Sequence, residues 1–312
     1  MEKLLTIKDL KVYYPIRSGI LNKVTGHIKA VDGVDLSIEP GKTYGIIGES
    51  GSGKSTIGKT IAGLEKATSG QIKYQGVDVL HSRARKKINY NKDVQMIFQD
   101  SLSSLNPKKK IKDIIAQPLK NFERLSELEL KKRIKDIIEV VGLDEDSLHK
   151  YPHQFSGGQR QRIDIARAIA TRPKLIIADE PVSALDLSVQ AQVLNYLKKI
   201  QQEYQVAYLF ISHDLGVVYH MCDTLAIMHR GRFVEVGERE DIYQDPQHIY
   251  TKRLLAAIPQ VDIAKRQENK SRRQQIEEEF LKNMASGYDE NGRPYPLKRL
   301  SATHLVAKKG DE

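Results

Sequence analysis

The sequence predicts an α/β fold with parallel strands, and three observations support this. Short runs rich in β-branched residues alternate with amphipathic helical stretches along most of the 312 residues. One apolar run, Thr43–Ile47, passes directly into a glycine-rich loop, and another, Leu175–Ala178, ends in two carboxylates. Ligands bind at the carboxyl ends of the strands in open parallel sheets. A functional site is therefore expected where these runs end.

The first α/β portion covers roughly the first 100 residues. Strands are expected at Leu5–Val12 and Ala30–Ile38, and a turn through Gly41 precedes the buried strand Thr43–Ile47. From about 100 to 150 the pattern becomes helical and charged. Apolar residues between Leu128 and Val141 fall on one helical face, and Gly142 ends that helix.

The second α/β portion begins with a helix over Gly158–Thr171, which Ser156 is placed to cap. The expected elements that follow are a strand at Leu175–Ala178, a helix at Val189–Ile200 and a strand at Val206–Ile211. Beyond 260 the chain becomes polar, with a stretch bearing Gly and Pro at 286–296. We expect this tail to be an appendage outside the core sheet, either ordered or partly disordered.

Composition excludes several classes of protein. With 40% hydrophobic and 29% charged residues, the chain can bury a large core, so wholesale disorder is excluded. The single cysteine, Cys222, cannot form an internal disulfide or a multi-thiolate metal site, which favours a reducing compartment. No run approaches the roughly 20 apolar residues of a transmembrane helix. Any work at a membrane would need other chains to span it.

The net charge of +10 raises the question of nucleic-acid binding. The basic residues are dispersed, however, and acidic residues often lie close by in the sequence. This favours a solvated charged surface over an anionic membrane face or partner, and either of these over nucleic acid.

Residues 48–56 fit the phosphate-binding loop pattern between an expected strand and an expected helix. The glycines allow backbone N–H groups to surround phosphate oxygens, and Lys54 adds a positive charge facing the β- and γ-phosphates. The Ser55 hydroxyl is placed to bind Mg²⁺. The expected ATP contacts are Gly48, Glu49, Ser50, Gly51, Ser52, Gly53, Lys54, Ser55 and Thr56.

Two further segments complement this loop. Asp179 and Glu180 end an apolar strand, where Asp179 would hold the Mg²⁺ shell and Glu180 would act as the general base on the attacking water. Ser156 and the residues after it open a helix, whose N-terminus suits phosphate.

In combination these motifs resemble the ATP-binding cassette (ABC) ATPase family over about residues 1–260, where the segment Ser156, Gly157, Gly158 and Gln159 is the family signature. The resemblance implies an antiparallel β part, a mostly parallel core sheet flanked by helices, and a helical subdomain over about 100–160. It also implies a head-to-tail pair of ATPase subunits with ATP between them. The signature residues would contact the nucleotide held mainly by the partner.

The resemblance assigns roles to four other residues. Tyr14 matches the aromatic residue that stacks on adenine, with Tyr13 as the alternative. Gln99 matches the glutamine that contacts Mg²⁺ and water, and Asp186 ends the loop that signals across the dimer. His213 matches the histidine that contacts the γ-phosphate and supports Glu180. The presence of both catalytic residues implies a chain able to hydrolyse ATP.

A narrower resemblance, to the oligopeptide/dipeptide importer ATPases, rests on segments 12–33, 99–107 and 245–259, the last within an extension over 232–312. Ser101 and Ile249 depart from it, because Pro is commoner at both positions. The cysteine cluster that holds an iron–sulfur centre in some of these ATPases is impossible with Cys222 alone.

This narrower resemblance implies a subunit that hydrolyses ATP to drive oligopeptide import, the second of two different ATPases. The implied partners are a sister ATPase, two transmembrane permeases and an extracytoplasmic peptide-binding protein, and the implied location is peripheral, at the cytoplasmic face of the cell membrane. The helical insert between Gln99 and Val141 is the candidate permease contact. Dipeptides, nickel or another small solute remain alternative cargoes, and a non-transport ABC ATPase acting on nucleic acid remains an alternative class. Whether the ATPase pair is a homodimer or a heterodimer stays open.

Overall fold

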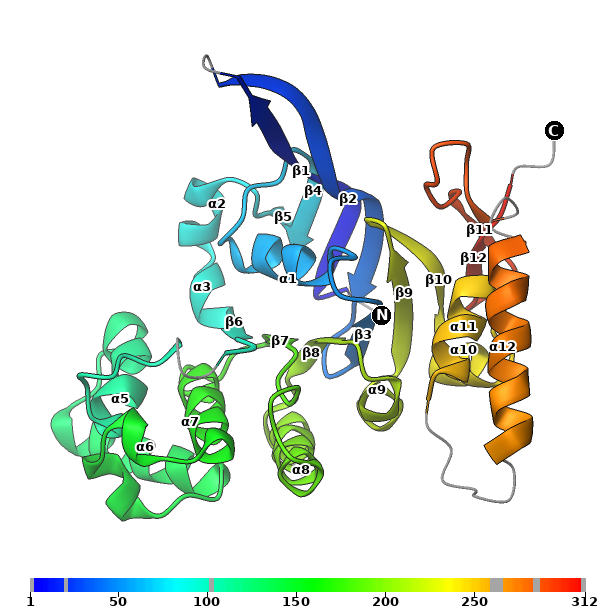
Figure 1. The fold of residues 1–312 in the computed structure, drawn as a ribbon. Coiled ribbons are helices and arrows are strands. Elements are labelled where there is room, and N and C mark those ends of the chain that lie inside the picture. The colour runs from blue at the N-terminus through cyan, green and yellow to red at the C-terminus, as the bar shows by residue number, and fades with distance from the viewer. Residues whose placement is uncertain (1–2, 20–21, 101–103, 259–265, 283–286, 310–312) are drawn as a thin grey trace. The chain divides into compact units, whose positions relative to one another are not determined.

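The computed structural model describes residues 3–19, 22–100, 104–258, 266–282 and 287–309 (Figure 1). The chain forms two compact units and passes between them several times. Unit 1 comprises residues 1–5, 37–42 and 73–210, and unit 2 comprises 6–36, 43–72 and 211–312. Parts of the segments that carry the narrower resemblance, at 20–21, 101–103 and 259, lie outside the described residues, as do tail residues 260–265 and 286.

Unit 2 contains a sheet in the order β11-β12-β10-β9-β3. Strands β3 and β9 are parallel, and β9, β10, β12 and β11 pair antiparallel in turn. The bounds are β3 Thr43–Ile47, β9 Thr224–His229, β10 Arg232–Glu238, β11 Leu297–Arg299 and β12 Leu305–Ala307. A second sheet has the order β2-β1-β4, with β1 Leu5–Ser18, β2 Lys23–Ile38 and β4 Ser69–Tyr74. The helices are α1 Lys54–Ala62, α9 Leu215–Met221, α10 Arg239–Gln244, α11 Ile249–Ala256 and α12 Arg266–Lys282.

Unit 1 contains strands in the order β8-β7-β6, of which β6 and β7 are parallel. The bounds are β6 Val94–Ile97, β7 Leu175–Asp179 and β8 Ala207–Ser212, and the short β5 Val77–Asp78 pairs with the end of β4. The helices are α2 Ser82–Lys87, α3 Tyr90–Asp93, α5 Ile111–Phe122, α6 Glu127–Val140, α7 Gly157–Ile169 and α8 Leu187–Tyr204, with 3₁₀ turns η1 Glu145–His149 and η2 Pro152–Gln154.

The predicted α/β fold is confirmed. Every residue of β7 and β8 is buried, which explains why these strands appear in the sequence as unbroken apolar runs. The predicted helix between 128 and 141 is α6, and its buried residues include Ile134, Ile137 and Ile138. The helix that Ser156 was expected to cap is α7, and Ser156 is its N-cap residue.

The expectation that the tail lies outside the core sheet was wrong. Strand β12 pairs with β10 through Glu235 and Val306, and β11 adds to β12, so the tail extends the sheet of unit 2. Both tail strands are three residues long. Alternation over three residues is too short to predict a strand, which explains why this extension of the sheet is not visible in the sequence.

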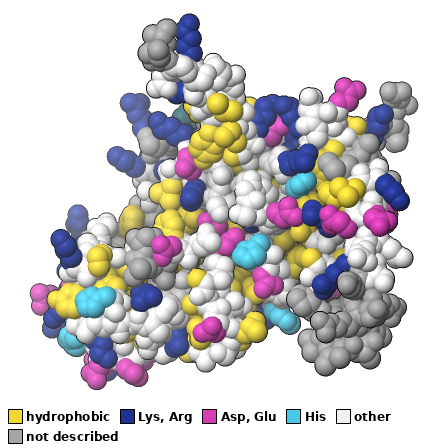
Figure 2. Space-filling model, in the orientation of Figure 1, with side chains coloured by type: hydrophobic (Ala, Val, Ile, Leu, Met, Phe, Trp, Pro, Cys, Tyr) yellow, Lys and Arg dark blue, Asp and Glu magenta, His cyan; other side chains and the backbone are white. Residues whose placement is uncertain are grey.

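Surface features agree with the dispersed charge of the sequence. On the face shown in Figure 2, Lys and Arg side chains are scattered among acidic ones and do not gather into one patch. Among the described residues, no helix combines the length and apolar character needed to cross a membrane.

Candidate functional site

The phosphate loop of unit 2 joins β3 to α1 and is packed tightly against neighbouring backbone. A Cβ on Gly48 would lie 2.1 Å from the carbonyl oxygen of Met228, and one on Gly53 would lie 2.0 Å from that of Ala30. Gly53 also has a φ of 109°, a conformation that side chains disfavour. These two glycines are therefore required for the loop to lie against β9 and β2.

Lys54 is only 4% exposed, yet its ammonium group lies within the loop. It donates hydrogen bonds to the carbonyl oxygens of Gly48 at 2.7 Å and Glu49 at 2.8 Å. Gly53, the N-cap residue, has no side chain, so α1 begins without a side-chain cap. A buried cation, a helix N-terminus without a side-chain cap and close backbone approach together suit a phosphate group. Ser55 and Thr56 follow in the first turn of α1.

Of the two candidate adenine-stacking residues, Tyr14 is nearer to this loop. Its hydroxyl lies near Thr56, at the end of the loop, and near Glu65. Burial raises the pKa of Tyr14, and its side chain is 36% exposed. The Tyr13 hydroxyl instead donates to Asp32, and Lys29 lies 5.3 Å from the Tyr13 ring centroid. Tyr13 is thus engaged in structural contacts, which favours Tyr14 for stacking.

Unit 1 brings together Gln99 and Glu180. Strand β7 ends at Asp179, which is 4% exposed, and Glu180 follows it with a left-handed backbone φ of 47°. The Gln99 amide donates a hydrogen bond of 2.8 Å to the Glu180 carboxylate. A left-handed non-glycine residue is uncommon and is often found at active sites. The hydrogen bond shows that the Glu180 side chain faces Gln99.

Asp164 on α7 is a residue of this region that sequence reasoning missed. Its carboxylate is fully buried and accepts hydrogen bonds from the Phe98 N–H at 3.4 Å and the Ser104 hydroxyl at 3.0 Å, and it pairs with Arg167. Burial raises its pKa. These contacts anchor the backbone beside Gln99 to the signature helix. An acidic residue at a core position of an otherwise apolar helix face was the signal that could have identified it.

The signature segment forms a capping box at the start of α7. The Ser156 hydroxyl accepts from the Gln159 N–H at 3.3 Å, and the Gln159 side chain accepts from the Ser156 N–H at 3.0 Å. A Cβ on Gly158 would lie 2.4 Å from Cγ1 of Val189 on α8, whereas Gly157 has more room. Gly158 therefore allows α7 and α8 to approach closely.

A cavity of about 440 Å³ in unit 1 connects these features. Its lining includes Gln99, Gly157, Glu180 and Ser183. Asp186 is the N-cap residue of α8. His213 is exposed and follows β8, in unit 2. The predicted site residues are thus divided between the units. The phosphate loop, Tyr14 and His213 belong to unit 2, and Gln99, the signature segment, Asp179, Glu180 and Asp186 belong to unit 1.

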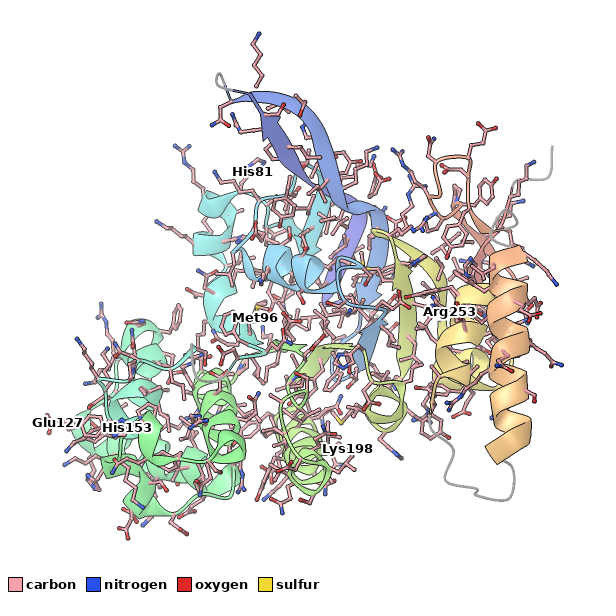
Figure 3. All side chains as sticks on the ribbon, in the orientation of Figure 1. His81, Met96, Glu127, His153, Lys198 and Arg253 are labelled. Atoms are coloured by element: carbon pink, nitrogen blue, oxygen red, sulfur yellow. The ribbon has the colours of Figure 1, made fainter. Side chains whose placement is uncertain are left out.

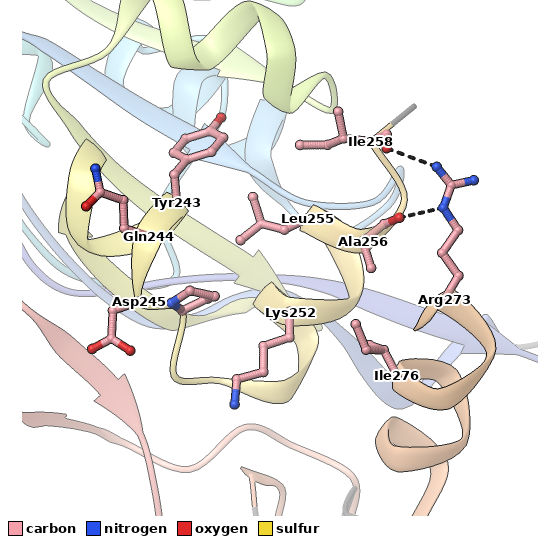
Figure 4. Close-up of a pocket in the computed structure, with 10 residues that line it drawn as sticks. Tyr243, Gln244, Asp245, Lys252, Leu255, Ala256, Ile258, Arg273 and Ile276 are labelled. Carbon is pink, nitrogen blue, oxygen red and sulfur yellow. Dashed lines mark hydrogen bonds between the residues drawn. The ribbon is translucent and has the colours of Figure 1, made fainter. Parts of the chain in front are cut away.

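The carboxyl-terminal extension has a cavity of its own, of about 640 Å³ (Figure 4). Its lining includes Tyr243, Lys252 and Arg273, and none of its lining residues was predicted as a site residue. The Arg273 guanidinium donates to the carbonyl oxygens of Ala256 at 2.7 Å and Ile258 at 2.9 Å, so it fixes the end of α11.

Comparisons with known proteins identify the family. The family model described as "ABC transporter" matches residues 31–183, and the one described as "Oligopeptide/dipeptide transporter, C-terminal region" matches 234–287. The chain is 60% identical over 313 residues to the oligopeptide transport ATP-binding protein OppF of Lactococcus lactis subsp. lactis, covering 100% of this chain and 98% of that protein. The chain belongs to the ABC transporter family.

Other members agree with this assignment. The oligopeptide transport ATP-binding protein AppF of Bacillus subtilis is 46% identical over 259 residues, covering 83% of this chain and 79% of that protein. Among solved structures, the dimeric post-hydrolysis state of the ATP-binding cassette MJ0796, bound to ADP and phosphate, superposes with a TM-score of 0.67. Its sequence is 27% identical, and the match covers 75% of this chain and 98% of the cassette. This ABC family chain is therefore an ATP-hydrolysing protein with the fold of an ABC cassette.

Proposed function

We propose that this chain is the ATP-hydrolysing subunit of an importer that takes up oligopeptides. The main support is that two family models match the same chain. One is the ABC transporter model, and the other is the model for the carboxyl-terminal region of oligopeptide/dipeptide transporters. Relatives that match along nearly their whole length are named for oligopeptide transport. Dipeptides, nickel or another small solute are alternative cargoes. The basic residues are scattered on the face shown in Figure 2, which gives little support to a non-transport ATPase acting on nucleic acid.

At the nucleotide, residues 48–56 bind the phosphates and Tyr14 stacks on adenine. Ser55, Gln99 and Asp179 are the residues that would hold Mg²⁺. A hydroxyl, an amide and a carboxylate are oxygen donors of the kind that Mg²⁺ prefers. Within the described residues no group of three His, Cys, Asp or Glu side chains forms a metal cluster, which is compatible with a site completed by phosphate and water. Bound Mg²⁺ would offset negative charge on the phosphates.

For hydrolysis, Glu180 accepts the proton of the attacking water, and His213 contacts the γ-phosphate. Gln99 holds the Glu180 carboxylate through its 2.8 Å hydrogen bond. The signature residues 156–159 contact the nucleotide of a head-to-tail partner, and Asp186 signals across that interface. The N-terminus of α7, which begins with the Ser156–Gln159 capping box, suits a second phosphate contact.

The partners in this proposal are a sister ATPase, two permeases and an extracytoplasmic peptide-binding protein. The subunit is attached peripherally at the cytoplasmic face of the membrane. The insert between Gln99 and Val141, which includes α5 and α6, contacts a permease.

The test is peptide uptake into vesicles that contain the whole assembly, with either the wild-type subunit or Glu180→Gln. We expect uptake of a labelled oligopeptide to require ATP and the wild-type subunit, and we expect unlabelled oligopeptides to compete better than dipeptides or Ni²⁺. Stronger competition by dipeptides or Ni²⁺ would indicate that the transported cargo is a dipeptide or nickel and not an oligopeptide. ATPase activity that responds to nucleic acid, but not to the permeases, would overturn the proposal.

A further inference from the structure

Helix α11 of the carboxyl-terminal extension contacts the phosphate loop at Glu49. The Tyr250 hydroxyl accepts a hydrogen bond of 3.1 Å from the Glu49 N–H. The Arg253 guanidinium, labelled on this helix in Figure 3, lies 3.2 Å from the Glu49 carboxylate. Residues three apart share a helix face. One face of α11 therefore holds both the backbone and the side chain of a single loop residue.

The backbone contact extends to Lys54 through one peptide group. The N–H that Tyr250 binds and the Gly48 carbonyl that Lys54 binds at 2.7 Å belong to the same peptide bond. This unit is planar and trans, so its N–H and C=O point in opposite directions and move together. The position of the Tyr250 hydroxyl thus influences where the Lys54 ammonium group is held.

Tyr250 is itself firmly fixed. Its side chain is fully buried, and its ring stacks on His229 at the end of β9, with 4.1 Å between centroids and 21° between planes. The His229 ring shares a hydrogen bond of 2.7 Å with the Tyr288 hydroxyl. Burial raises the pKa of Tyr250 to about 12, so its hydroxyl stays neutral. The loop is therefore held by a rigid aromatic group and not by a mobile surface side chain.

The contact between Arg253 and the Glu49 side chain offsets the negative charge of Glu49. Glu49 places a carboxylate in a loop that binds a polyanion, and repulsion between them would weaken binding. Arg253 lies 3.2 Å from this carboxylate and 2.7 Å from that of Glu277 on α12, and its guanidinium lies 4.8 Å from the Phe280 ring centroid. Because the Arg253 guanidinium is also paired with Glu277 and packed on the Phe280 ring, it is held in position beside Glu49.

We propose that Tyr250 and Arg253 are positioning residues through which the carboxyl-terminal extension sets the ATP affinity of the phosphate loop. Tyr250 fixes the peptide that holds Lys54, and Arg253 neutralises Glu49. The inference rests on the phosphate-binding role of residues 48–56 in the proposed function.

The test measures Mg-ATP dissociation constants of the full-length chain by calorimetry. Tyr250→Phe keeps the stacked ring and removes one hydroxyl, and we expect about a fivefold weaker affinity, the equivalent of one hydrogen bond. Arg253→Gln should weaken binding by about fivefold to tenfold at low salt, and the deficit should shrink as salt screens Glu49. Adding Glu49→Gln to Arg253→Gln should restore the affinity to within about twofold of wild type, because the unpaired charge is gone.

The matched controls are Tyr243→Phe and Arg273→Gln. Each removes a similar group of the extension that binds a backbone carbonyl, that of Leu215 for the Tyr243 hydroxyl and that of Ala256 for the Arg273 guanidinium. Both should bind ATP like the wild type. Thermal unfolding of every variant separates loss of affinity from loss of folding.

Wild-type affinity in folded Tyr250→Phe and Arg253→Gln would overturn the inference, provided that Lys54→Ala abolishes binding. Equal weakening by the two controls would also overturn it, because the effect would then be structural. An Arg253→Gln defect that Glu49→Gln does not relieve would refute the neutralising role. Normal ATP binding by Lys54→Ala would instead refute the proposed function of the loop.

Discussion

Gln99 and Glu180 are 81 residues apart in the chain and are joined by a hydrogen bond of 2.8 Å in unit 1. The carboxylate is the acceptor, so the amide orients an oxygen while leaving the Glu180 group able to take a proton.

We therefore expect Glu180→Gln to bind ATP but to lose about 100-fold or more in turnover, the usual contribution of a general base. Phosphate release by the purified assembly and ATP binding by the subunit are the two measurements. Glu203→Gln, which changes an exposed acid on α8, serves as the control. Wild-type turnover by Glu180→Gln would exclude Glu180 as the base.

The packing of α7 on α8 gives a stability prediction. Gly158→Ala would place a methyl group 2.4 Å from Cγ1 of Val189 and should cost about 1–3 kcal/mol of unfolding free energy through overpacking. Val189→Ala removes the opposing methyl groups, so the double variant should recover most of the loss. Denaturant unfolding measures both. Gly157→Ala is the comparison, because its Cβ would lie 3.8 Å from Leu185.

Glu235 links three parts of the extension in unit 2. Its buried carboxylate accepts from the N–H groups of Gln247 at 2.7 Å and His248 at 2.9 Å, and it lies 2.7 Å from Nε2 of His304. Glu235→Ala should cost about 3 kcal/mol or more, because it leaves these buried groups unpaired.

Glu240→Ala, at an exposed ion pair, should cost less than about 1 kcal/mol. The two free energies of unfolding are compared by chemical denaturation. Equal losses in the two variants would contradict the linking role of Glu235.

The pH dependence of stability should reflect His248, the N-cap residue of α11. Burial lowers its pKa from 6.5 to about 4, and its Nδ1 accepts from the Tyr250 N–H. Between these two pKa values the unfolded chain binds a proton that the folded chain does not, so stability is fully present above pH 6.5 and falls toward pH 4. The loss amounts to roughly 3 kcal/mol.

His248→Asn keeps an N-cap acceptor and cannot titrate. We expect thermal unfolding of this variant to depend less on pH between 4 and 6.5. His229, whose pKa burial also lowers to about 4, should supply the remaining slope. An unchanged pH profile would contradict the assignment to His248.

Much of the fold and site could be predicted from local patterns. The helix start at Ser156 was predictable because the N-cap and its Gln159 partner lie three residues apart. The loop at residues 48–56 was predictable because one continuous segment carries its pattern between a strand and a helix, and its phosphate-binding role stays a prediction. The buried strand β7 was predictable from an apolar run that ends in two carboxylates.

Other features depend on contacts that no local pattern encodes. Tyr250 contacts a loop residue 201 positions earlier in the chain. Asp164 is a buried acid whose partners Phe98 and Ser104 come from another segment. The contact of Tyr13 with Asp32, which adds support for Tyr14 as the stacking residue, also joins residues that no short pattern pairs. The chain topology decides which of these residues meet, and the spacing of residues along the sequence does not reveal that topology.

The short strands β11 and β12 also determine how the sheet of unit 2 ends. Without them, one side of the seven-residue β10 would be an open edge with unpaired backbone groups, the kind of surface that recruits strands from other molecules. With them, Glu235 and Val236 in the middle of that edge pair with β12, and β11, only three residues long, pairs with β12 in turn. A chain cut after Ile258, although close to the length of the ATPase domain, should therefore aggregate on expression. Aggregation of the shortened chain would mean that the tail protects the protein against self-association.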